Sequence, residues 1–202
     1  MIMIEFEHKL HSEGKKFVAG VDEAGRGPLA GPVFAAAVIM DEDKYIPDIK
    51  DSKKMSEKKR EEVFEYIINN AVAYSVCAVS EGEIDEINIL NATHKAMNGA
   101  VDSLSVKPDY VLIDGNSIKN MNHPHETVVK GDAKVYCIAA ASILAKVSRD
   151  RYIREIGDKY PEYNFGKHKG YGTKEHTEAI LKYGPCPIHR KSFLKKLLGD
   201  VK

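Results

Sequence analysis

Cysteine is scarce in this sequence, with three residues in 202. Cys77, Cys137 and Cys186 lie far apart and form no CxxC pair. An odd count without metal-ligand spacing argues against a disulfide framework and against a zinc site, and it favours a reducing compartment. The sequence therefore predicts a cytoplasmic protein.

Long apolar runs and linkers are also absent. No stretch approaches the roughly 18 apolar residues that a membrane helix needs, and the mixed, acidic residues 1–16 lack the pattern of a signal peptide. There is no internal repeat, low-complexity segment or Ser/Gly linker. We predict a single domain over residues 1–202 without membrane contact, with a core at about 17–160 and a C-terminal helical extension at about 161–202.

The net charge is zero, but the charges are unevenly distributed. Residues 130–202 carry 16 Lys/Arg and 8 Asp/Glu, whereas residues 1–129 carry 14 and 22. This asymmetry fits an acidic site that faces a basic, substrate-holding part of the molecule. It fits equally well an uneven scatter of charges over solvated helices, because charge distribution speaks to association rather than to fold.

Apolar runs predict the strands. Residues 17–21 and 32–40 are joined by the Gly/Pro-rich turn EAGRGPLAG, a pattern typical of a β-hairpin. Residues 71–79, 110–114 and 126–130 also have strand composition. Continuously apolar strands are covered on both faces, so helices are expected on both sides of the sheet.

Helical spacing of apolar side chains marks the segment after Ser56, the predicted N-cap. Residues 84–101 predict one or two helices, and about 133–159 predict a long helix whose small, apolar first half is buried. A further helix is expected at 173–183, ended by Gly184-Pro185, and a short basic one at the C-terminus. Together these elements predict an α/β domain with one central sheet.

Four carboxylates stand at or just after predicted strand ends: Asp22, Glu23, Asp114 and Asp132. Neighbouring residues of a strand point to opposite faces, so Asp22 and Glu23 converge only if the strand ends or bulges there. An ionised carboxylate beside an apolar core is costly unless it is paired or holds a metal. Acidic residues that end several strands of one sheet can therefore converge on a shared cation.

Each carboxylate also has a purely structural interpretation. Asp114 precedes Gly-Asn and fits a turn residue, Asp132 fits the N-cap of the long helix, and Glu23 can pair with Arg26. The joint pattern is more specific than any single member.

Oxygen-only ligands suit Mg²⁺ or Mn²⁺. Two such ions about 4 Å apart can activate a water and stabilise the leaving oxygen of a phosphodiester. His168, His176 and His189 lack zinc spacing, and His123 and His125 flank a proline in an expected loop. We expect these five to be surface or packing residues by default, with His168 and His189 as the two that can lie on the substrate side.

Gly25-Arg26-Gly27 follows the first two carboxylates. Glycines permit close approach of the main chain to a nucleic acid and positive φ, and Arg26 can fork to a phosphate. By itself such a triplet is a weak signal, and it is not a P-loop because no GKS or GKT follows.

The segment around this triplet, residues 17–38, resembles the opening of ribonuclease HII, the type 2 ribonuclease H. The resemblance runs in order through residues 17–38, 51–61, 84–93, 111–116, 130–152, 160–176 and 189–193, beginning with FVAGVDEAGRGPLAGPVFAAAV and ending with HRKSF. It implies a ribonuclease H-like fold, with a central mixed sheet flanked by helices and a C-terminal helical extension that binds substrate.

The resemblance also implies roles for individual residues. The family's metal ligands fall on the four carboxylates. Its GRG motif, which grips the junction nucleotide and its 2′-OH, falls on Gly25, Arg26 and Gly27. Its stacking tyrosine falls on Tyr171, and further positions that contact the nucleic-acid backbone or support the ligands fall on Lys53, Lys54, Ser142 and Lys146.

Two of these assignments have plain alternatives. Tyr171 is flanked by glycines and fits an aromatic that packs against the helix starting at Thr173. Lys53 and Lys54 fit a solvated pair of charges at a helix entry.

The function implied is an endoribonuclease that uses two Mg²⁺ or Mn²⁺ ions and leaves 5′-phosphate and 3′-hydroxyl ends. It would hydrolyse the RNA strand of RNA/DNA hybrids and cut 5′ of ribonucleotides embedded in duplex DNA, during primer processing and ribonucleotide repair, as a monomer.

The residues alone reach only metal-dependent phosphoryl chemistry on a polyanion. Three other functions therefore stay open. An integrase or junction resolvase shares strand-end carboxylates but lacks DEAGRG. A non-catalytic nucleic-acid-binding module has no need of four acids beside phosphates. A phosphatase would hydrolyse small phosphate esters.

Overall fold

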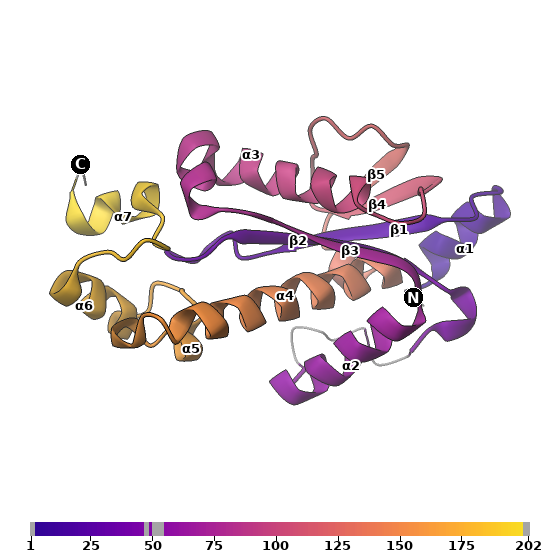
Figure 1. Ribbon diagram of the computed structural model, residues 1–202. Helices are drawn as coiled ribbons and strands as arrows, with labels where there is room; N and C mark the ends of the chain where they lie inside the picture. Colours follow the sequence, from indigo (N-terminus) through magenta and orange to yellow (C-terminus); the bar gives the residue numbers. More distant parts are fainter. Residues whose placement is uncertain (1–2, 47–48, 50–54, 200–202) are drawn as a thin grey trace.

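The protein is a five-stranded mixed sheet with helices on both faces, as seen in a computed structural model that describes residues 3–46, 49 and 55–199 (Figure 1). The strand order is β3-β2-β1-β4-β5. β1 pairs antiparallel with β2 and parallel with β4, which confirms the predicted hairpin. The strands are β1 (Val18–Ala24), β2 (Val33–Met40), β3 (Ala71–Val79), β4 (Tyr110–Asp114) and β5 (His125–Val128).

Helix α3 covers one face of the sheet, whereas α2 and α4 cover the other (Figure 1). The short helices α5, α6 and α7 gather at one end of the sheet. Within the described residues, no helix is both long and apolar enough to cross a membrane. The helices are α1 (Glu5–Ser12), α2 (Glu57–Asn70), α3 (Glu81–Asp102), α4 (Tyr136–Gly157), α5 (Phe165–His168), α6 (Lys174–Tyr183) and α7 (Lys191–Leu198).

Local signals in the sequence explain where several helices begin and bend. The Ser56 hydroxyl accepts a hydrogen bond from the Lys59 N–H, so the predicted N-cap of α2 is confirmed. The segment that predicted one or two helices is α3, which is kinked at Asn88, where φ is 66°. The long helix was expected from about residue 133, but α4 starts at Tyr136 because residues 131–133 form a separate 3₁₀ turn, η3.

The sheet and a helix approach each other closely between β1 and the start of α4. A Cβ atom added to Gly20 would lie 2.1 Å from the carbonyl carbon of Cys137. The small side chains that follow, Ala139, Ala140 and Ala141, are completely buried, as the sequence predicts. This contact fixes the register of α4 over β1 and so places its next turns beside Asp22.

The C-terminal helices pack into an apolar cluster with the hairpin turn and the end of α4. Ile153 of α4 and Ala30 of the turn are fully buried there against Phe165, Ile180 and Leu194. The backbone of Ala30 also forms a β-bridge with His189. The end of the chain is therefore docked onto the turn that follows β1.

Candidate active site

Asp22 and Glu23 lie inside β1, because the strand continues to Ala24 and pairs with β2 as far as Phe34. The expected strand end at this point was wrong. The pairing of β1 with β4, however, stops at Val21, one residue before Asp22. Beyond that point β1 has an open side next to the end of β4, and this opening lets both carboxylates turn toward Asp114.

The structure brings three of the four predicted carboxylates together. One oxygen from each of Asp22, Glu23 and Asp114 can be chosen so that all three lie within 4.8 Å of one another. The Gly131 N–H donates to Asp114 Oδ1 over 2.6 Å and fixes that side chain. Asp114 therefore serves the cluster, although it also ends β4 as a turn residue would.

Asp132 is buried but does not belong to the cluster of three. It lies in η3, next to the glycine whose N–H holds Asp114. Its alternative role as the N-cap of α4 was wrong, because Val135 occupies that position.

The electrostatics of the cluster favour a cation. Burial raises the pKa of Asp22 well above its ordinary value, the charges of Glu23 and Asp114 raise it further, and a hydrogen bond with Ser142 opposes them. Burial also raises the pKa of Glu23, and Arg26 acts against it from 3.4 Å. Three partly buried carboxylates that repel one another form a donor set that fits Mg²⁺ or Mn²⁺, since hard cations prefer oxygen ligands.

These carboxylates form one wall of a cleft of about 360 Å³. Ser142 and Lys146 line it from α4, and the Lys146 ammonium lies 2.8 Å from the buried Asp150 carboxylate. Arg60 of α2 also lines the cleft. Sequence reasoning missed Arg60, because no feature of the segment SEKKREE distinguishes this arginine from the solvent-exposed charged residues around it. Lys53 and Lys54 lie outside the described residues.

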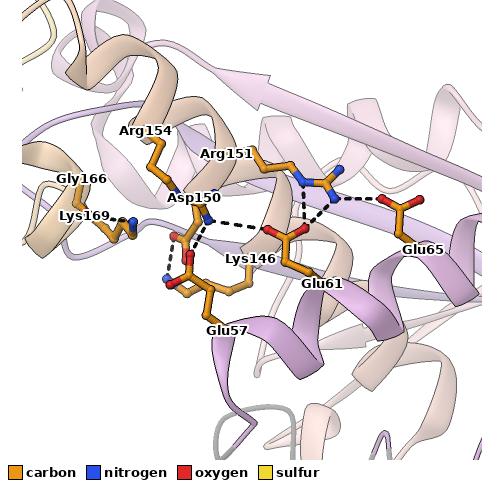
Figure 2. Close-up of polar contacts among 9 residues, drawn as sticks. All are labelled: Glu57, Glu61, Glu65, Lys146, Asp150, Arg151, Arg154, Gly166 and Lys169. Atoms are coloured by element: carbon orange, nitrogen blue, oxygen red, sulfur yellow. Dashed lines mark hydrogen bonds and ion pairs between the residues drawn. The ribbon is translucent and has the colours of Figure 1, made fainter.

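Ion pairs join α2, the helix that carries Arg60, to α4 (Figure 2). Arg151 donates to Glu61 over 3.0 Å and to Glu65 over 2.9 Å, and Arg154 contacts Glu57. Exposed pairs of this kind each contribute little to stability. Their combined effect is to fix how α2 lies along α4, and with it the rim of the cleft.

The GRG turn lies beside the cluster, and its two glycines differ. Gly25 has φ of 96°, and a Cβ atom there would lie 2.2 Å from Arg149 Nε, so both conformation and space require glycine. Gly27 has no positive φ, and its added Cβ would lie at an ordinary 3.7 Å from Tyr171 Cε1. Only one of the two glycines therefore has the positive φ expected of them.

Tyr171 lines the same cleft and is 43% exposed, so its interpretation as a packing residue was wrong. The Arg149 guanidinium carbon lies 5.8 Å from the centre of its ring. The Tyr171 N–H donates to the His168 carbonyl over 3.0 Å, and the Tyr171 carbonyl lies 2.9 Å from His176 Nδ1. A firmly held backbone thus presents an exposed ring next to the GRG turn.

The histidines near Tyr171 are packing residues. His168, His176 and His189 are buried, and the Nε2 atoms of His176 and His189 lie 3.0 Å apart. Burial lowers the pKa of His176 and of His189 to about 4, so both are neutral at pH 7. The possible role of His168 and His189 near a substrate was wrong.

Two completely buried arginines, Arg149 and Arg190, lie behind the GRG turn. Arg149 donates to the carbonyls of Ala30 and Lys169, and Arg190 donates to those of Gly25, Arg26 and Gly31. The sequence does not reveal them, because arginine is usually exposed and neither residue has an acidic neighbour at helical spacing that would mark it.

Comparison with known proteins places the chain among nucleases. The profile of the family described as Ribonuclease HII matches residues 19–196. Ribonuclease HII of Caldicellulosiruptor bescii is 61% identical over 96% of this chain and 95% of its own. That of Caldicellulosiruptor saccharolyticus is 59% identical over the same shares. The crystal structure of ribonuclease H2 from Pyrococcus horikoshii superposes with a TM-score of 0.74 at 32% identity, over 90% of this chain and 96% of that one.

Proposed function

The chain belongs to the ribonuclease HII family of endonucleases, which act on RNA/DNA hybrids, and we propose that it also cuts 5′ of ribonucleotides embedded in duplex DNA. The observation that carries this proposal is the cleft itself. Its wall holds three mutually repelling carboxylates, and its rim holds Gly25 of the GRG turn and Tyr171. The proposed cation site and the residues proposed to recognise the ribose are therefore adjacent.

We propose that Asp22, Glu23 and Asp114 hold Mg²⁺ or Mn²⁺, with Asp132 as the fourth ligand in a site for two ions. Such ions supply an activated water and stabilise the departing 3′-oxygen, so that 5′-phosphate and 3′-hydroxyl ends result. In this proposal Asp22 and Asp114 lie at the centre of the metal site. The Glu23 N–H holds the Asp22 carboxylate in place, and the Gly131 N–H holds that of Asp114.

Selection of RNA depends on the 2′-OH, the one group that separates the two kinds of sugar. We propose that the main chain of Gly25, Arg26 and Gly27 contacts this hydroxyl, and that the Tyr171 ring stacks on the neighbouring deoxyribose. A Cβ atom added to Gly27 would lie 3.7 Å from the Tyr171 ring, which supports a joint site because the ring stands next to the GRG turn.

The rest of the substrate would be held by its phosphates. Lys146 and Arg60 line the cleft, and Ser142 hydrogen-bonds Asp22. We propose that these residues, Lys53, Lys54 and the extension at about 161–202 contact or support the bound duplex, so that affinity falls as salt rises. We further propose that the protein acts as a cytoplasmic monomer in primer processing and ribonucleotide repair.

The proposal is tested with 5′-labelled duplexes that are identical in sequence. One is all DNA, one contains a single ribonucleotide and one is a continuous RNA/DNA hybrid, and each is incubated with Mg²⁺, Mn²⁺ or EDTA. We expect one cut immediately 5′ of the single ribonucleotide, cutting of the hybrid, and no cutting of DNA or in EDTA.

Two outcomes, one in that experiment and one in a parallel assay with p-nitrophenyl phosphate, would count against the proposal. Cutting of the hybrid alone would retain the class of enzyme but remove the proposed roles of the GRG turn and Tyr171. Turnover of p-nitrophenyl phosphate with no cutting of any duplex would instead favour a phosphatase.

A further inference from the structure

The C-terminal segment at residues 188–190 runs alongside the hairpin turn. The Gly31 N–H donates to the Ile188 carbonyl over 2.9 Å, and the Arg190 N–H donates to the Leu29 carbonyl over the same distance. With the bridge between Ala30 and His189, these bonds fix the backbone of Arg190 directly behind the GRG turn. The last helix, α7, begins immediately afterwards.

The Arg190 side chain donates its hydrogen bonds to main-chain carbonyls. Its Nη2 donates to the Gly25 carbonyl over 2.6 Å, its Nη1 to that of Arg26 over 3.0 Å, and its Nε to that of Gly31 over 2.8 Å. Burial and the charge of Arg149 lower the pKa of Arg190 to about 10, so it stays charged at neutral pH. A fully buried cation with three such partners holds the turn in one conformation.

The carbonyls of Gly25 and Arg26 determine where the next N–H groups point. A trans peptide is planar, and its C=O and N–H point in opposite directions. With both carbonyls turned inward to Arg190, the N–H groups of Arg26 and Gly27 point outward. Among the described residues neither N–H donates to a protein acceptor, and Arg26 and Gly27 are exposed.

We propose that Arg190 is the positioning residue for ribonucleotide selection, which it achieves by aiming the N–H groups of Arg26 and Gly27 at the 2′-OH oxygen and the adjacent phosphate. This inference rests on the proposed function. The buried charge also polarises the two peptides and strengthens their N–H groups as donors. Lysine cannot replace this role, since its ammonium is a point charge without the planar fork that spans several carbonyls.

The test compares Arg190→Lys and Arg190→Met with Asp85→Ala. Asp85 accepts hydrogen bonds from the N–H groups of Lys191 and Ser192, so its loss loosens the same segment but removes none of the three Arg190 hydrogen bonds to the turn. Binding of fluorescent duplexes, one all DNA and one with a single ribonucleotide, is measured in Ca²⁺ by anisotropy. Melting temperature reports folding, and kcat and KM in Mg²⁺ are measured separately.

The ratio of interest is the dissociation constant for the all-DNA duplex divided by that for the duplex with one ribonucleotide. We expect this ratio to fall about tenfold in Arg190→Lys and Arg190→Met, because two hydrogen bonds to the ribonucleotide are misaligned. Asp85→Ala should keep the wild-type ratio despite a lower melting temperature. In Arg190→Ala, which leaves a cavity of guanidinium shape, millimolar methylguanidinium should restore part of the ratio, and methylammonium should not.

The inference would be overturned by any one of the following results. A folded Arg190→Lys protein with the wild-type ratio would overturn the inference, and so would an equal loss in Asp85→Ala, which would show general loosening. If Arg190→Lys and Arg190→Met were both unfolded, failure of methylguanidinium to restore the ratio in Arg190→Ala would overturn the inference instead. Wild-type protein that binds both duplexes alike would overturn the proposed recognition of the 2′-OH and the inference with it, whereas the cleavage test decides the class of enzyme separately.

Discussion

Replacing Asp22 by asparagine will lower the rate of metal-dependent cleavage by about 10³-fold or more, and it will raise the melting temperature of the metal-free protein. The loss follows because a metal ligand is worth several kcal/mol to the transition state, and each 1.4 kcal/mol or so is a factor of ten. The asparagine oxygen can still accept the Glu23 N–H, which Asp22 Oδ1 accepts over 2.7 Å, so the local fold is kept.

The gain in stability has an electrostatic cause. Burial and the charges of Glu23 and Asp114 raise the pKa of Asp22 in the folded protein. A carboxyl with a raised pKa stabilises the fold fully only below the pKa of the unfolded chain, 3.8, and that stability is lost as pH rises through the folded pKa. One pKa unit corresponds to about 1.4 kcal/mol, and 1 kcal/mol shifts the melting temperature of a domain this size by about 2–4 °C.

Differential scanning calorimetry in EDTA at pH 5 and pH 8 measures this effect. Wild type should lose more stability between the two values than Asp22→Asn, and added Mg²⁺ should stabilise wild type more than the variant. Asp43→Asn, the same change at an exposed position, should leave activity and melting temperature unchanged. Destabilisation of the metal-free protein by Asp22→Asn would mean that the cluster is a structural network.

The second large effect is expected from Gly20→Ala. The new methyl group would lie 2.1 Å from a backbone carbon of Cys137 and 2.4 Å from the backbone nitrogen of Ile138, so α4 or β1 must move. Overpacking against side chains costs about 1–3 kcal/mol. Against backbone we expect at least about 4 kcal/mol, a large part of the 5–15 kcal/mol that holds a typical domain.

Urea unfolding of Gly20→Ala measures the cost, and Gly82→Ala is its control. Gly82 lies in α3 with no atom within 4 Å of an added Cβ, so alanine there should be neutral or stabilise by up to about 1 kcal/mol. Any Gly20→Ala protein that folds should also cleave slowly, because a shifted α4 moves Ser142 away from Asp22. Equal stability of the two variants would contradict the packing of α4 on β1.

Much of the fold was predictable because it depends on local patterns. The hairpin followed from two apolar runs around a Gly/Pro-rich turn, and the start of α2 followed from Ser56. The strand at 71–79 matches β3, and that at 110–114 matches β4. The strand order was not predictable from periodicity, since nothing local states that β4 lies beside β1.

The carboxylates were found for a partly wrong reason. We expected Asp22 and Glu23 to converge because β1 ends or bulges there, but β1 continues to Ala24 and it is its pairing with β4 that stops, which is a property of the sheet and not of the strand itself. Arg149 and Arg190 were missed for a related reason. A buried arginine is stabilised by carbonyls distant in the chain, and carbonyls have no sequence signature.

The most direct test of the account is the anomalous scattering of Mn²⁺ in crystals of the protein. We predict a peak within coordination distance of carboxylate oxygens of Asp22, Glu23 and Asp114, and a second peak shared with Asp132 when a duplex with one ribonucleotide is bound to a slow variant. A map with no peak at these carboxylates, from protein that cleaves in Mn²⁺, would contradict the central claim that this cluster is the metal centre.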